Sequence, residues 1–90
     1  MSLYFFDSSA LVKRYVREHG SDWVLHLTNP ALSHEILVAS ITGVEVISAL
    51  ARQRRSRNLS GIDLSLALAL FRSDFVNEYR ILELSPPVLS

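Results

Sequence analysis

The chain has 90 residues, 49% of them hydrophobic, with nine basic and nine acidic side chains and no cysteine. This length allows one small domain, 1–90, and the composition excludes a disordered or collagen-like chain. Without cysteine, a disulfide framework and a thiolate zinc site are excluded, which suits a reducing compartment. No apolar run approaches the roughly 20 residues that span a bilayer, and no secretion signal is recognisable. We therefore predict a cytoplasmic protein without a membrane segment.

The N-terminal part of the chain predicts one strand and two helices. Residues 3–6 are continuously apolar, as expected for a strand that is buried on both faces. Residues 8–19 carry apolar side chains at helical spacing, and Gly20 is expected to end that helix. Ser21 is then expected to cap a second short helix, in which Trp23 anchors the core.

The remaining chain predicts two further strands, over residues 35–40 and 80–84, and two longer helices. The helix over 42–56 is expected to bury Val44, Ile47, Leu50 and Ala51. The helix over 60–79 begins with a capping-box pattern and is expected to face inward with Leu64, Ala67, Leu68, Phe71 and Phe75. Strands that alternate with helices predict a three-layer α/β/α fold, in which a parallel sheet is covered on both faces.

Two acidic residues follow the first two predicted strands. Asp7 comes directly after residues 3–6, and Glu45 lies just beyond residues 35–40. Because open α/β sheets bind ligands at the carboxyl ends of their strands, the two carboxylates could converge there on a divalent cation. The alternative is structural, since Asp7 could cap the following helix, and Glu45 could close a capping box with Thr42.

Four arginines fall within six positions near the expected end of the 42–56 helix: Arg52, Arg54, Arg55 and Arg57. A short basic cluster can contact nucleic-acid phosphates, because guanidinium groups match phosphate oxygens. The alternative is that cations at this position complement the helix dipole and stay solvated. The pattern leaves both interpretations open.

Three stretches carry a resemblance to a known family. They are residues 4–13, with the block Asp-Ser-Ser-Ala-Leu, residues 15–24, and residues 40–50, with the block Thr-x-x-Glu. Together they resemble the N-terminal part of a PIN domain, most closely the toxin ribonucleases of VapBC-type toxin-antitoxin pairs. The resemblance implies a PIN-like fold and a metal-dependent endoribonuclease that uses magnesium or manganese to hydrolyse RNA, with an antitoxin protein as partner.

The resemblance also assigns site residues. By position, Asp7 and Glu45 match the first two acidic ligands of the family, and Ser9 matches a hydroxyl residue that hydrogen-bonds within the site. All three are therefore expected to be catalytic. The family's further acidic residues come from a C-terminal portion that this sequence does not reach, so the resemblance implies an incomplete domain and an incomplete metal shell.

An incomplete sheet would leave the strand at residues 3–6 with an unpaired apolar edge, which invites pairing with another chain. We therefore expect a homo-oligomer. Two alternatives to the ribonuclease remain open: a non-catalytic PIN-like interaction or dimerisation module, and a nucleic-acid binder that uses the arginine cluster without chemistry.

Overall fold

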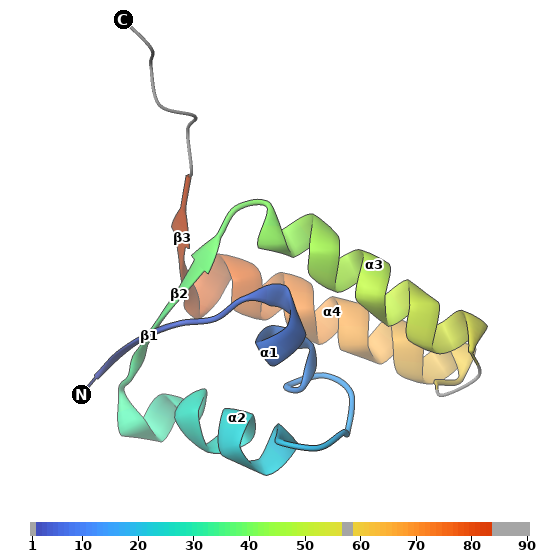
Figure 1. The fold of residues 1–90 in the computed structure, drawn as a ribbon, viewed down its shortest axis with the longest axis horizontal. Coiled ribbons are helices and arrows are strands. Elements are labelled where there is room, and N and C mark those ends of the chain that lie inside the picture. Colours follow the sequence, from blue (N-terminus) through green and yellow to red (C-terminus); the bar gives the residue numbers. More distant parts are fainter. Residues whose placement is uncertain (1, 57–58, 84–90) are drawn as a thin grey trace, which may run out of the picture.

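The computed structural model describes residues 2–56 and 59–83 (Figure 1). Over these residues the chain forms a mixed α/β fold around a parallel sheet. Its strands are β1 (Leu3–Phe5), β2 (Glu35–Ala39) and β3 (Tyr79–Leu82), in the order β1-β2-β3. The predicted parallel sheet is confirmed, with β2 in the centre and both of its neighbours parallel to it.

Four α-helices accompany the sheet in the described part of the chain: α1 (Ser8–Val12), α2 (Ser21–Leu27), α3 (Thr42–Arg55) and α4 (Gly61–Asn77). A short 3₁₀ turn, η1 (Pro30–Leu32), precedes β2. Helices α3 and α4 pack side by side along their lengths, and α1 packs on α3 as well (Figure 1). Each parallel strand pair is thus joined through helices, as parallel pairing requires.

The core draws on α1, α2, α3, α4 and β2. Its most deeply buried side chains are Leu11, Val24, Val38, Val46, Leu50 and Phe71. Burial of such side chains contributes roughly 25 cal/mol per Å² of apolar surface removed from water, so these residues supply most of the stabilisation.

The expectation that the first strand is buried on both faces is wrong. Leu3 and Phe5 are 59% and 57% exposed, whereas Phe6, just after the strand, is 3% exposed. Strand β1 is at the edge of the described sheet and pairs with β2 alone. A continuous apolar run predicts a strand, but it cannot say which of the strand's faces other elements cover.

The first helix is much shorter than predicted. Helix α1 ends at Val12, and the backbone then tightens into i to i−3 hydrogen bonds, from Arg14 N to Leu11 O at 3.0 Å and from Tyr15 N to Val12 O at 2.9 Å. The turn leaves Arg14 and Tyr15 beside Asp74 on α4, which an unbroken helix need not do. Tertiary contacts therefore override the helical pattern here.

The loop before α2 corrects two further expectations. Gly20 has φ +90°, a conformation that favours glycine, and it is the N-cap of α2. Ser21 is the first residue of that helix, not its cap: its buried hydroxyl accepts from Glu18 N at 2.9 Å and donates to Val16 O at 3.2 Å. Ser21 therefore holds the loop in place.

Trp23 does not anchor the core, since it is 60% exposed. The buried residues of α2 are Ser21, Val24 and Leu27. The helix is short and turns this narrow face inward, so the large ring at position 23 stays at the surface.

The buried face of α3 overlaps the predicted one only in part: Leu50 is buried as predicted, and Ala51 is half-buried. Val44 and Ile47 are largely exposed, and the buried residues are Thr42, Gly43, Val46 and Leu50. The reason is close packing at Gly43, where a Cβ would lie 3.1 Å from the Phe75 ring of α4. Glycine lets α4 approach at this point, which rotates the contact face away from Val44.

Helix α4 follows its prediction closely. The Ser60 hydroxyl accepts from Asp63 N at 3.0 Å, so the expected cap is confirmed. Ala67 and Phe71 are buried, and the other predicted inward residues, Leu64, Leu68 and Phe75, pack against the core.

Candidate functional site

Asp7 caps helix α1 at the carboxyl end of β1. Its Oδ1 atom accepts hydrogen bonds from Ala10 N at 2.9 Å and from the Ser9 hydroxyl at 3.0 Å. The Oδ2 atom makes no hydrogen bond within the described residues. The capping alternative is therefore correct for Asp7, but capping uses only one carboxylate oxygen and leaves the other available to a ligand.

Glu45 has no comparable structural role. The predicted capping box is not formed, because Ile41 is the N-cap of α3, no side chain caps that helix, and Thr42 is its buried first residue. The Glu45 side chain is exposed and makes no hydrogen bond or ion pair within residues 2–56 and 59–83. Its charge near the helix N-terminus is favoured by the dipole.

Asp7 and Glu45 both follow the carboxyl ends of neighbouring parallel strands. Phe5 pairs with Leu37, and Phe6 N donates to Leu37 O at 3.0 Å, so Asp7 leaves the sheet close to the end of β2. Glu45 belongs to the first turns of the helix that follows β2. This is the edge at which open parallel sheets hold ligands.

The direction of Glu45 around α3 can be derived from the contact at Gly43. Gly43 faces α4 through Phe75. At 3.6 residues per turn, Glu45 is about 160° around the helix from Gly43, so it lies on the flank away from α4. Helix α1, which Asp7 caps, also packs on α3.

The carboxylate oxygens of Asp7 and Glu45 are of the type that binds hard divalent cations, but there are few of them. Mg²⁺ and Mn²⁺ prefer carboxylate oxygens, and Mg²⁺ usually keeps several waters beside one or two carboxylates. Among the residues that the structure describes, no group of three or more His, Cys, Asp or Glu could hold a metal ion. Glu83 follows β3 at the same edge, but β2 separates it from β1.

The arginine cluster divides between two flanks of α3. The Arg54 guanidinium lies over Gly61 of α4, with Nε 3.7 Å from the position that a Cβ would occupy. Arg52 and Arg55 are exposed and belong to the last turn of the helix. The predicted contact at Arg57 lies outside the described residues.

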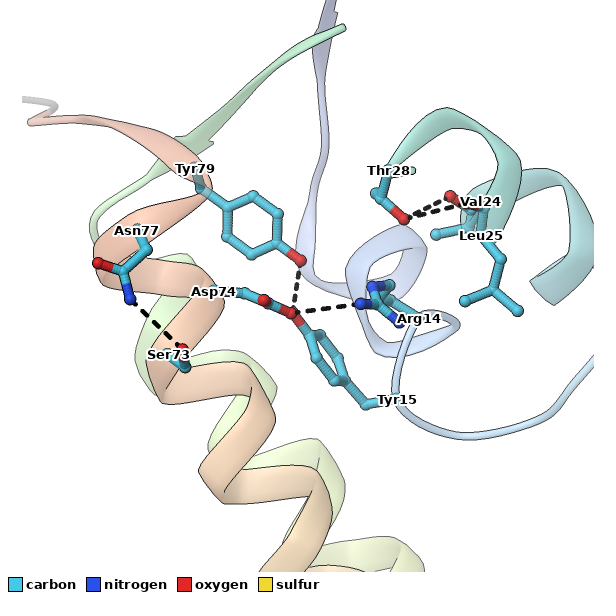
Figure 2. Close-up of polar contacts among 9 residues, drawn as sticks. All are labelled: Arg14, Tyr15, Val24, Leu25, Thr28, Ser73, Asp74, Asn77 and Tyr79. Atoms are coloured by element: carbon cyan, nitrogen blue, oxygen red, sulfur yellow. Dashed lines mark hydrogen bonds and ion pairs between the residues drawn. The ribbon is translucent and has the colours of Figure 1, made fainter. Parts of the chain in front are cut away.

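A buried polar network at the opposite edge of the sheet was missed by the sequence analysis (Figure 2). The Tyr15 hydroxyl donates to Asp74 Oδ2 at 2.8 Å, and the hydroxyls of Tyr15 and Tyr79 are hydrogen-bonded to each other. Arg14 Nη2 lies 3.7 Å from the same Asp74 oxygen. The network joins the turn after α1 to the end of α4 and the start of β3.

Burial dominates the electrostatics of this network. Asp74 is 7% exposed and Tyr79 is 8% exposed. Desolvation, with a further contribution from the nearby Asp74 charge, raises the pKa of Tyr79 to about 12, although the hydrogen bond with Tyr15 acts in the opposite direction. Desolvation, followed by the neighbouring Tyr79 and Asp74, raises the pKa of Tyr15 far above its usual range. Both hydroxyls therefore stay protonated at neutral pH.

The network stabilises the fold and offers little room for a ligand. The cavity beside it, lined by Arg14, Thr28, Asp74 and Tyr79 among others, has a volume of about 50 Å³, enough for little more than water. One sequence signal could have found it: Asp74 lies three and seven residues after Phe71 and Ala67, on the buried face of α4. An acid on an apolar face needs partners.

Neither models of known protein families nor curated proteins give a match to this chain. Within the described residues, no helix is both long enough and apolar enough to cross a membrane.

Proposed function

We propose that the chain is a metal-dependent ribonuclease with a PIN-like, three-layer α/β/α fold, of the kind that serves as the toxin of a type II toxin-antitoxin pair. The observation that carries the proposal is the pair Asp7 and Glu45 at one sheet edge, each with carboxylate oxygen left over. The motif resemblance of residues 4–13 and 40–50 supports the same assignment.

In this proposal Asp7 and Glu45 hold the cation, and water completes its coordination. When bound, Mg²⁺ or Mn²⁺ supplies Lewis acidity, lowers the pKa of water and neutralises charge on an RNA phosphate. The Ser9 hydroxyl donates to Asp7 Oδ1 at 3.0 Å and so restrains the carboxylate. Glu45 is exposed and without a competing partner in the described part of the chain.

The proposed partners are an RNA substrate, an antitoxin protein and further copies of the chain, all in the cytoplasm. Self-association is supported by β1, an edge strand whose Leu3 and Phe5 side chains face solvent. Light scattering after size-exclusion chromatography should therefore give a mass above that of one chain. A stable monomer at tens of micromolar would remove this part of the proposal.

The metal site is tested by titration calorimetry with MnCl₂ and by cleavage of a labelled single-stranded RNA. We expect manganese binding and manganese-dependent cleavage, both strongly reduced in Asp7→Asn and Glu45→Gln. Asp63→Asn is the matched control, because it removes the same charge from an exposed residue in the first turn of α4. Manganese heat that Asp7→Asn retains in full, or no heat from the unaltered chain, would overturn the proposal.

A second candidate is a non-catalytic interaction module with the same fold. It is favoured by the outer surface of α4, where Ile62, Leu66 and Val76 are 76%, 65% and 79% exposed. Large apolar side chains that gather at an exposed surface often mark an interaction site. The calorimetry separates the candidates, because a module without a metal site gives no manganese heat.

A further inference from the structure

Helix α3 presents two chemically different flanks on either side of its buried face. One flank meets α4: Gly43 contacts Phe75, and the Arg54 side chain crosses over to Gly61. The other flank contains Glu45 and turns away from α4. This second flank begins at Glu45, one of the two candidate metal ligands, and its residues Glu45, Ser48 and Arg52 are exposed.

Two arginines continue the Glu45 flank. Arg52 follows Glu45 by seven residues, which is two turns and within about 20° of the same line, so the two Cα atoms are about 10 Å apart along the helix. Arg55 lies in the same exposed quadrant, about 15 Å from Glu45. Both arginines are exposed, whereas Arg54 is on the opposite side, about 180° from Glu45.

The side chain between Glu45 and the arginines on this flank is small. Ser48, the exposed residue between Glu45 and Arg52 on this flank, has a small polar side chain. A small residue lets an extended ligand lie close to the helix without displacing a bulky group. Its hydroxyl can also donate to a phosphate oxygen.

Arg52 and Arg55 are available for a ligand. The ion pairs within the described residues are Arg14 with Asp74, Arg17 with Asp22 and Arg80 with Glu35. Neither Arg52 nor Arg55 is among them, and neither makes a hydrogen bond through its side chain there. Their guanidinium groups are therefore free to form two-pronged contacts with phosphate oxygens.

We propose that single-stranded RNA lies along this flank of α3, with its phosphates on Arg52 and Arg55 and one phosphate at the cation that Asp7 and Glu45 would hold. The inference rests on the proposed ribonuclease function and adds a binding track with a direction, from the start of α3 toward its end. The contacts are to the RNA backbone, so the track contributes affinity that does not depend on sequence.

The test uses fluorescence anisotropy of a labelled single-stranded RNA over a series of KCl concentrations, with MnCl₂ present. All proteins carry Asp7→Asn, so that the probe is not cleaved. In this background, Arg52→Gln should weaken binding several-fold and reduce the salt slope by about 0.7, the value for one lost phosphate contact on a single strand. Arg55→Gln should act in the same direction, and Arg52→Lys should restore part of the affinity because it keeps the charge.

Arg54→Gln is the matched control, because it removes the same charge from the same turn of α3. It should weaken binding less than Arg52→Gln, while the melting temperatures of the two variants should be alike, since both lose a cation near the helix C-terminus. Equal losses of RNA affinity in Arg52→Gln and Arg54→Gln, or no loss in either variant, would overturn the proposed RNA track.

The two proposals fail in distinguishable ways. Absence of RNA binding by the parent protein overturns the track, whatever the metal titration shows. Missing manganese binding overturns the ribonuclease. RNA binding that stays sensitive to Arg52, together with no manganese binding by the chain that keeps Asp7, would leave the arginines as a nucleic-acid surface and remove the carboxylates from it.

Discussion

The acidic residues at the two edges of the sheet differ in burial and in the partners they have. At the carboxyl edge, Asp7 and Glu45 are exposed, and only one oxygen of Asp7 is committed to the fold. At the amino edge, Asp74 is buried and its Oδ2 atom is held by Tyr15 and approached by Arg14 (Figure 2). Burial and partners, not residue type, decide whether a carboxylate serves the structure or remains available to a ligand.

This difference separates stability from function. Removing a buried acid leaves its partners without their hydrogen bonds in a place that water reaches poorly, which is costly. Removing an exposed acid costs the fold little, because water replaces its interactions. We therefore expect the amino edge to respond mainly in the free energy of unfolding and the carboxyl edge mainly in metal and RNA binding.

The largest expected effect is at the amino edge. Asp74→Ala should lower the free energy of unfolding by about 3 kcal/mol, because it strands the Tyr15 hydroxyl and the Arg14 charge. Denaturant unfolding followed by circular dichroism measures the change. Ser73→Ala is the control, since its exposed hydroxyl accepts from Asn77 and from no other described residue, and it should stay within about 0.5 kcal/mol of the unaltered chain. A similar loss in both variants would contradict the role of the network.

The next effect is the response of the amino edge to alkaline pH. Above pH 10 an unfolded tyrosine loses its proton, whereas folded Tyr79 keeps its proton until its pKa of about 12. The stability contribution is therefore complete below pH 10, and the free energy of unfolding falls by about 1.4 kcal/mol per pH unit for this tyrosine as the pH rises toward 12. Tyr15 adds to the slope in the same direction.

Denaturation midpoints measured between neutral pH and the alkaline range test this slope. Tyr79→Phe removes one titrating group and should flatten the profile, although it also lowers the stability at neutral pH. An unchanged slope in this variant would show that Tyr79 ionises equally easily in the folded and unfolded chains.

A smaller effect is expected at Asp7, where two substitutions separate its two roles. Asp7→Ala removes the helix cap and should cost about 1 kcal/mol, whereas Asp7→Asn keeps an acceptor for Ala10 N and should cost only a few tenths. Both should lose manganese binding, because both remove the carboxylate charge. Equal stability losses from Ala and Asn would mean that the cap is not what Asp7 contributes to the fold.

The smallest effect on stability is expected at Glu45. Glu45→Gln should change the free energy of unfolding by less than about 0.5 kcal/mol, since the side chain is exposed and has no partner in the described structure. The same variant should nevertheless reduce manganese binding in calorimetry. A fall of several kcal/mol in the free energy of unfolding would mean that Glu45, like Asp74, stabilises the fold. The contrast between the two edges would then be lost.

Local patterns in the sequence predicted the secondary structure well. The parallel arrangement of three strands, the bounds of α3 and the Ser60 cap of α4 agree with the structure. The bounds of α3 and the Ser60 cap depend on contacts a few residues apart, so short stretches of sequence contain the necessary information. The parallel arrangement was inferred from the alternation of strands and helices along the chain. Asp7 and Glu45 were singled out by their position after strand ends, and Ser9 by the family resemblance; the function of all three stays a prediction.

Only the tertiary structure decided which faces are covered. Close packing at Gly43 selected the buried face of α3, and contacts with Asp74 accompany the early end of α1 and the position of Tyr15. Residues 15, 74 and 79 are far apart in the chain, and periodicity within one element has no information about such pairs. The sequence by itself determined the type and order of the main helices and strands, although not the early end of α1. Long-range packing decided which acids are buried, because burial depends on neighbours that are distant in the sequence.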